Sequence, residues 1–118
     1  MRVQFAPESD VPGALRVTVT GSLDTPGSEK FMAEMATRVI PHCPSLILDM
    51  SGVEWVSSAG VGALVRLLTR TQSSNNTMAL FGCGPKVQTV LRICGLDQAL
   101  NLCETADQAR ARLSPTKH

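Results

Sequence analysis

The alternation of apolar and polar positions divides the middle of the chain into a strand and a helix. The run Leu46–Leu48 is fully apolar and ends at Asp49, a pattern typical of a short strand covered on both faces. We expect this strand to end at Asp49 or Met50. An irregular segment, residues 53–56, should then connect it to the next element.

A helix is predicted to start near Ser58, because Ser57 and Ser58 can each accept the free N–H groups of a first helical turn. Gly60, Gly62 and Ala63 would let this helix lie close to a sheet. The larger apolar residues recur at helical spacing: Val61, Leu64, Val65 and Leu68.

Two strands are predicted before this segment, over Arg2–Phe5 and Ala14–Thr20. Apolar and polar residues alternate in the second, which indicates a strand with one solvated face. A helix should follow with Thr25 as its cap and Pro26 in its first position. Its buried face is predicted from five apolar residues: Phe31, Met32, Met35, Ala36 and Val39. We interpret Met32 and Met35 as packing residues.

The C-terminal half repeats the alternation of strand and helix. It predicts a strand at Thr77–Phe81, a helix at Lys86–Cys94, a short strand at Leu100–Cys103 and a helix from Thr105 to Leu113. Residues 114–118 are expected to be a frayed tail. This order predicts an α/β fold with a mixed sheet that is parallel in its later part. A length of 118 residues suits one domain, residues 1–118.

Composition narrows the possible functions. The 11 basic and 10 acidic residues give a net charge of +1, and 3% of the residues are aromatic, so nucleic-acid binding is not expected. There is no apolar run of about 18 residues, and the first ten residues lack the apolar core of a signal peptide. We therefore expect a soluble, cytoplasmic protein without direct membrane insertion.

The cysteines do not predict a metal site. No two of them form a C-x-x-C pair, and His42 and His118 are the only histidines that could complete a ligand set. We interpret them as small buried residues of a reducing compartment, with Cys43 as the candidate for exposure. The four are Cys43, Cys83, Cys94 and Cys103.

Catalysis is not expected either. A serine nucleophile needs a base within reach, whereas His42 lies between predicted loop residues and His118 lies beyond the last helix. Sequence motifs for phosphate loops, dinucleotide binding and zinc proteases are absent. The acidic residues of the predicted turns fit capping and solvation better than catalysis: Asp24, Asp49, Glu54 and Asp97. We predict a binding protein without a cofactor.

The central segment resembles the signature of the STAS domain family, D-hydrophobic-S-x-V-x-x-hydrophobic-D-S-[ST]-G. Without gaps, the signature puts the family's phosphorylated serine at Ser58. Ser57 stands where the family usually has Asp, and Ala59 where it has Ser or Thr. The positions that match are Asp49, Ser51, Val53, Val56 and Gly60.

Two flanking motifs extend the resemblance over nearly the whole chain. Gly21–Asp24 is similar to the family's G-x-L-D turn, and Gly95–Asp97 to its G-L-D after the third helix. The resemblance implies a mixed sheet of four to five strands with about four helices, mainly on one face.

The resemblance also implies a function, that of an anti-sigma factor antagonist. Such proteins bind a serine kinase that sequesters a sigma factor, and phosphorylation by that kinase releases them; a phosphatase would reverse the reaction. Ser58 is the expected acceptor and Ser57 the second choice. The expected partner contacts are Asp24, Asp49, Ser57, Ser58, Ala59 and Gly60.

Several alternatives stay open. Ser58 could be a helix cap without regulation, and Trp55 could be a core residue, which is slightly favoured, or an interface anchor. The chain could be a constitutive STAS subunit of a larger complex, such as a lipid-transport ABC system. It could also be a small nucleotide-binding module that uses Gly82–Gly84 or the start of the Ser58 helix.

Overall fold

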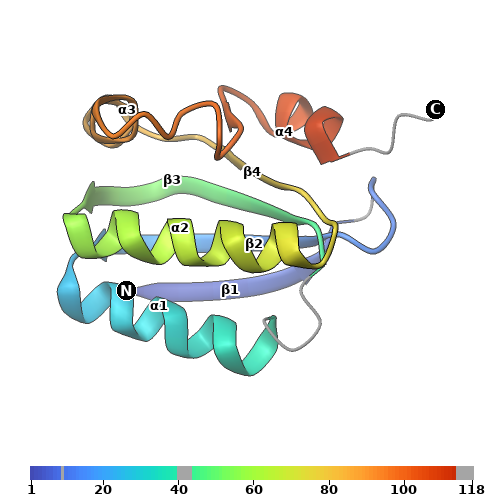
Figure 1. Ribbon diagram of the computed structural model, residues 1–118, viewed down its shortest axis with the longest axis horizontal. Helices are drawn as coiled ribbons and strands as arrows, with labels where there is room; N and C mark the ends of the chain where they lie inside the picture. The colour runs from blue at the N-terminus through green and yellow to red at the C-terminus, as the bar shows by residue number, and fades with distance from the viewer. Residues whose placement is uncertain (9, 40–43, 114–118) are drawn as a thin grey trace.

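In the part of the chain that the structure describes, two strands are followed by alternating helices and strands, five strands and four helices in all (Figure 1). The structure is a computed structural model that describes residues 1–8, 10–39 and 44–113. The element types and their order are those predicted. They are β1 Arg2–Pro7, β2 Leu15–Leu23, α1 Thr25–Arg38, β3 Leu46–Val56, α2 Ser58–Ser73, β4 Met78–Phe81, α3 Pro85–Ile93, β5 Leu102–Cys103 and α4 Ala106–Leu113.

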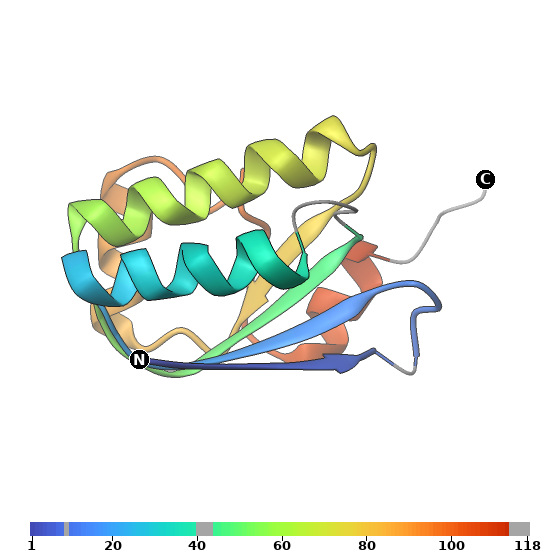
Figure 2. The same cartoon turned by 90° about the horizontal axis from the view of Figure 1, so that it is seen from below.

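The strands form one mixed sheet in the order β1-β2-β3-β4-β5. β1 pairs with β2 in an antiparallel manner, and the other three pairings are parallel. Because parallel strands all end at the same edge of a sheet, α1, α2 and α3 all begin at one end of the molecule (Figures 1 and 2).

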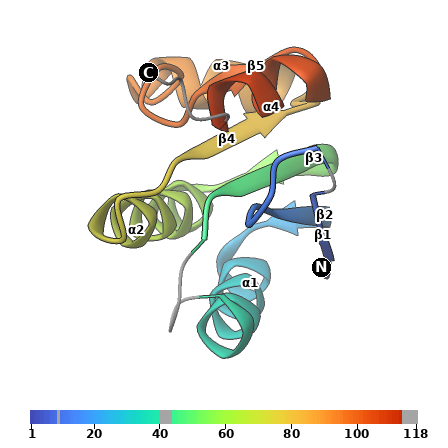
Figure 3. The same cartoon turned by 90° about the vertical axis from the view of Figure 1, so that its right-hand side faces the viewer.

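The sheet has an apolar core on each face. Leu46 and Leu48 of β3 belong to the larger core, which α1, α2 and α3 cover, while Ile47 faces a smaller core with Ala109 and Leu113 of α4. Side chains of a strand alternate between faces, so the apolar run of β3 serves both cores. Figure 3 shows α4 separated from α1 and α2 by the sheet. Helices lie mainly on one face, as predicted.

β3 is longer than predicted, and the expected end of this strand at Asp49 or Met50 is wrong. It continues to Val56, so residues 53–56 are strand and not an irregular connection. Its first part pairs with both neighbours, but beyond Asp49 it pairs with β2 alone. Two register shifts accommodate extra residues in β3, one between Thr18 and Thr20 of β2 and one between Gly21 and Ser22. Such bulges bend and twist a strand.

Other boundaries and contacts differ in detail. β2 runs through Gly21 to Leu23 and leaves no turn before Asp24. In α1, Phe31 and Met35 are buried as predicted and Met32 is partly buried, whereas Ala36 is exposed. In α2, Leu67 is fully buried although the pattern did not single it out. Residues 114–118, the predicted tail, lie outside the described residues.

The cysteines divide between the core and the surface. Cys83 and Cys103 are buried, as expected, but Cys94 is exposed because it follows the last turn of α3. Cys43 and His42 lie outside the described residues. Burial raises the pKa of the Cys83 thiol from 9.0 to about 12, since the thiolate would lose its hydration.

A buried carboxylate connects the β1–β2 loop to α4. Glu8 is 6% exposed, and its two oxygens lie 3.6 Å from Arg16 and 3.8 Å from Arg110. The Arg16 guanidinium also stacks 5.1 Å from the ring centroid of Phe81 and lies 3.9 Å from Asp49. These ion pairs and this ring contact thus connect β2, β3 and β4 to the β1–β2 loop and to α4.

The raised pKa of Cys83 predicts a loss of stability at high pH. A group with a raised folded-state pKa contributes its full stabilisation below its unfolded pKa and loses it as the pH rises toward the folded value. Urea unfolding at pH 8.5 and 10.5 should show wild type losing about 1–2 kcal/mol more than Cys83→Ala. Equal losses in the two proteins would contradict the burial of this thiol.

Candidate functional site

The first turns of α1 and α2 lie side by side at the carboxyl ends of β2 and β3 (Figure 1). Asp24 caps α1, and its Oδ1 accepts a hydrogen bond of 2.8 Å from the Gly27 N–H. The predicted cap Thr25 is instead the first residue of the helix. An aspartate can cap both by its geometry and by its charge at the positive end of the helix dipole.

Ser57 is the cap of α2 and also ties the helix to β2. Its Oγ accepts a hydrogen bond of 3.3 Å from the Gly60 N–H and donates one of 3.1 Å to the Leu23 carbonyl. The Ser57 backbone N–H donates to the same carbonyl at 2.9 Å. The last carbonyl of β2 therefore holds the start of α2 in place.

Two glycines permit this close packing. A Cβ at Gly60 would lie 2.4 Å from the Leu23 carbonyl oxygen, and a Cβ at Gly27 would lie 2.1 Å from the Ser22 carbonyl oxygen. Both distances are far below van der Waals contact, so each helix can approach the end of β2 only where a side chain is absent. Glycine is therefore required at both positions because a side chain would collide with β2, and not because of its backbone freedom.

Ser58, in contrast to Ser57, does not stabilise the helix start through its side chain. It is the first residue of α2 and is exposed, and within the described part of the chain its hydroxyl takes part in none of the side-chain hydrogen bonds. Ala59 beside it is partly buried and Gly60 is buried. The two adjacent serines thus have separate roles, with Ser57 as the cap and Ser58 facing solvent.

A largely apolar groove of about 700 Å³ runs between α1 and α2, and Ser58 and Thr25 lie at its start. Glu29 and Arg66 supply its charged groups. Ser28 lines the groove and is 3% exposed, and its hydroxyl has no hydrogen-bond partner among the residues described. Buried hydroxyl groups are usually paired, so this one could accept a bond from a molecule docked in the groove.

Of the six predicted contact residues, the structure gathers five at this end of the molecule. Asp24, Ser57, Ser58, Ala59 and Gly60 belong to the two helix starts. The sixth, Asp49, lies seven residues before the end of β3, about 20 Å along the strand. There its Oδ1 accepts hydrogen bonds of 2.6 Å and 3.0 Å from the Ser51 hydroxyl and N–H.

Sequence reasoning missed two features of this end. The sequence slightly favours Trp55 as a core residue, but 48% of its surface is exposed, whereas the next residue, Val56, is buried in the larger core. Ser28 and Gly27 were not singled out. Glycine destabilises a helix unless another contact requires it. A glycine in the first turn of α1 was therefore the sequence signal that could have indicated close packing there.

The glycines at 82 and 84 have a structural explanation. Gly82 has a φ of +78°, which favours glycine, and a Cβ there would lie 3.1 Å from the Cβ of Ser51. Gly84 caps α3 with its backbone. These residues connect β4 to α3 beside the bulged part of β3.

Among residues 1–8, 10–39 and 44–113, no group of three or more His, Cys, Asp or Glu side chains is arranged to hold a metal ion. No helix among the same residues has the length and apolar character needed to span a membrane.

Comparison with known proteins gives a family and several structural neighbours. The family model of the STAS domain matches residues 9–109. An anti-sigma factor antagonist from Mycobacterium paratuberculosis superimposes with a TM-score of 0.78 at 23% identity, over 95% of this chain and 94% of that one. The phosphorylated form of the Bacillus cell fate determinant SpoIIAA gives 0.69 at 18%, over 94% and 98%.

A third neighbour has a different setting. The murine anion transporter Slc26a9 gives a TM-score of 0.72 at 24% identity, over 84% of this chain but only 17% of the transporter. Identities at this level show a shared fold alone. The same fold thus occurs as a small separate protein and as part of a much larger one.

The close packing at Gly60 predicts opposite effects of two alanine substitutions in one helix. Gly60→Ala should lower the free energy of unfolding by about 2 kcal/mol or more, because the new methyl group collides with Leu23. Gly62→Ala should raise it by about 0.5–1 kcal/mol, since nothing lies within 4 Å and alanine favours helix. Urea denaturation measures both; equal effects would contradict the proposed contact.

The separate roles of the two serines predict a second contrast. Ser57→Ala should cost about 1–2 kcal/mol, because α2 loses its cap and the Leu23 carbonyl loses a donor. Ser58→Ala should change stability by less than about 0.5 kcal/mol, as surface substitutions generally do. A larger loss from Ser58→Ala than from Ser57→Ala in thermal unfolding would reverse the assignment of the cap.

Proposed function

Because this chain belongs to the STAS domain family, we propose that it is an anti-sigma factor antagonist controlled by phosphorylation of Ser58. It would act as a single cytoplasmic domain that binds an anti-sigma factor serine kinase. The kinase would phosphorylate the antagonist and thereby release it, and a phosphatase would restore the binding form.

The exposure of Ser58 next to an engaged Ser57 is the observation that carries this proposal. A kinase needs a hydroxyl that it can reach and that the fold does not require. The Ser58 hydroxyl meets both conditions, since the cap of α2 is supplied by Ser57. The position therefore combines accessibility with a fixed place on a rigid helix.

A phosphate on Ser58 is expected to leave the fold intact. It would lie at the start of α2, where free N–H groups and the positive end of the helix dipole stabilise an anion. Its charge of about −2 and its bulk would instead act outward. At the start of the α1–α2 groove, they would oppose a closely packed or acidic partner.

Ser57 is a poorer acceptor for physical reasons. A phosphate on its Oγ would remove the hydrogen that is donated to Leu23 and place a dianion against that carbonyl. This would disrupt the cap and the contact with β2. The replacement of the family's usual Asp by Ser57 is compatible with the proposal, because a serine oxygen also accepts the Gly60 N–H.

Two neighbours support the proposal by analogy. The Mycobacterium paratuberculosis protein is an anti-sigma factor antagonist, and SpoIIAA has a phosphorylated form. We extend both properties to this chain on the strength of the family and of the Ser58 geometry together. Asp24 and Ala59 would contribute partner contacts around the serine, whereas Gly60 is buried against Leu23 and would act by holding α2 in place. A role for Asp49 in binding stays a separate prediction.

The direct test is phosphorylation by purified kinases. Each anti-sigma factor serine kinase encoded in the same genome would be incubated with the protein and ATP, and trypsin would then release residues 39–66 for mass spectrometry. Wild type and Ser57→Ala should both gain one phosphate on Ser58, and Ser58→Ala should gain none. Ser58→Asp should bind that kinase at least tenfold more weakly than wild type.

Two results would overturn the proposal. One is the absence of phosphorylation by every such kinase, together with an unmodified peptide in cells at rest and under stress. The other is equal kinase affinity for wild type and Ser58→Asp. Co-purification of the unmodified protein with an ATP-binding cassette subunit would then favour the constitutive-subunit alternative.

A further inference from the structure

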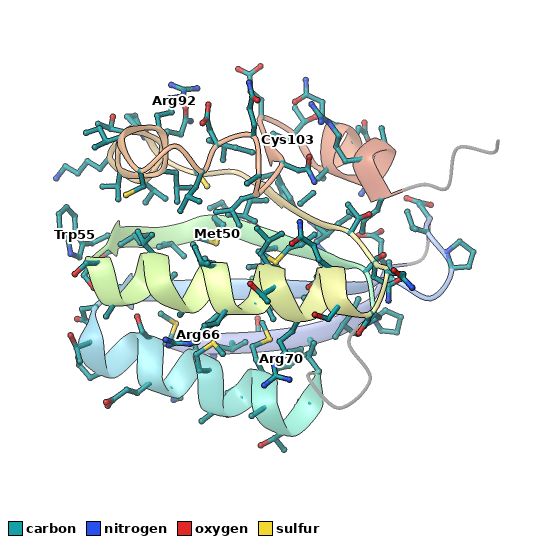
Figure 4. All side chains as sticks on the ribbon, in the orientation of Figure 1. Met50, Trp55, Arg66, Arg70, Arg92 and Cys103 are labelled. Carbon is teal, nitrogen blue, oxygen red and sulfur yellow. The ribbon has the colours of Figure 1, made fainter. Side chains whose placement is uncertain are left out.

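An exposed apolar patch lies on the side of the α2 start that faces α3. Trp55 and Ile93 are the two exposed large hydrophobic residues of the described chain, with 48% and 80% of their surfaces accessible. Figure 4 shows Trp55 projecting away from the ribbon at the end where α2 begins. Packing of the fold does not explain either exposure, since Val87 and Leu91 already bury the inner face of α3.

The patch surrounds a shallow hollow of about 330 Å³. Its walls are Trp55, the residues Pro85, Lys86 and Thr89 of the first turns of α3, and Val90. Ile93 continues the same face of α3 one turn further on. The hollow is at the small end of the range of ligand pockets, with room for one or two side chains.

The charge of the hollow is positive. Lys86 lies in the first turn of α3, which contains no acidic residue, so its ammonium group adds to the positive end of the helix dipole instead of opposing it. Within the described residues Lys86 forms no ion pair. Glu54, which precedes Trp55 in the sequence, is not among the residues that line the hollow. A cation in this position destabilises the helix, and a bound carboxylate would offset this unfavourable interaction with the helix dipole.

We propose that this hollow is a second docking point for the kinase, and that it binds an apolar side chain flanked by an acidic residue. The inference rests on the proposed function, because it names the chemistry of that same partner. Tryptophan is prominent among residues that dominate binding energy. Two large apolar residues are too few for a stable interface between copies of this chain, which needs about 800 Å² from each partner.

The hollow and the α1–α2 groove flank Ser58. α1 and α3 lie on opposite sides of the start of α2 in Figures 1 and 3, and three residues of chain place the Trp55 Cα within about 11 Å of the Ser58 Cα. An acidic segment held by Lys86 would therefore lie close to the acceptor. Phosphorylation would repel the group that docking attracts, which gives the switch its direction.

The single tryptophan of the chain allows a selective measurement. The protein would be labelled with 5-fluorotryptophan, and its ¹⁹F resonance followed while the unlabelled kinase that phosphorylates Ser58 is added. The resonance should shift or broaden on binding, and much less so for the Ser58-phosphorylated protein. A resonance unchanged at saturating kinase would contradict docking at Trp55.

Two substitutions that change the net charge equally distinguish docking at the hollow from a general electrostatic effect on kinase binding. Lys86→Glu should weaken kinase binding three- to tenfold, an effect that shrinks at high salt, although it favours the helix dipole and cannot act by unfolding α3. Arg92→Glu makes the same change on the same helix, but Arg92 lines a different hollow with Asp97 and Asn101. It should leave the affinity within twofold.

Trp55→Ala should raise the Kd, and the KM for Ser58 phosphorylation, at least tenfold with kcat little changed. If a kinase phosphorylates wild type and Trp55→Ala with equal KM, this docking point is wrong and the proposed function stands. If Lys86→Glu and Arg92→Glu weaken binding equally, the specific role of Lys86 is wrong. If no kinase acts on Ser58, both proposals fail together.

Discussion

The contact between the end of β2 and the first turn of α2 fixes the end of the molecule at which α1 and α2 begin. The Leu23 carbonyl accepts two hydrogen bonds from Ser57, and this contact can form only because Gly60 presents no Cβ to that carbonyl. Gly27 allows α1 an equivalent approach to Ser22. Parallel strands bring the two helix starts to one edge, and the glycines set how close they come.

In the proposed mechanism, this arrangement would separate stability from signalling. Structural hydrogen bonds concentrate on Ser57, so the adjacent Ser58 would change its charge at little cost to the fold. The helix dipole would tolerate an added phosphate, while a groove on one side and a positively charged hollow on the other would expose that phosphate to a partner seated there. Such a regulatory site would alter what the surface binds without altering the sheet beneath it.

Much of this was predictable from the sequence, and the errors have physical causes. Periodicity predicted every element, since buried faces repeat with the period of their structure. It placed the end of β3 too early, because residues 51–54, which mix Ser51, Gly52 and Glu54 with the buried Val53, continue the strand through bulges paired with β2 alone. The sequence favours Thr25 as the cap because Pro26 suits the first position of a helix, whereas Pro26 is the second residue of α1 and Asp24 is the cap. The exposure of Trp55 could not be predicted from periodicity, because the bulges of β3 and the loss of pairing with β4 beyond Asp49 decide which of its last residues are buried.

We propose that phosphorylation of Ser58 lowers the affinity for the partner and leaves the fold unchanged. The most direct measurement is a comparison of backbone amide NMR spectra of the unmodified protein and of protein carrying phosphoserine at position 58 by genetic encoding, with unfolding followed on the same samples. The structure predicts shift changes confined to the first turns of α1 and α2 and the adjoining end of β3, with equal or slightly greater stability. Shift changes throughout the sheet, or a loss of more than about 1 kcal/mol, would contradict it.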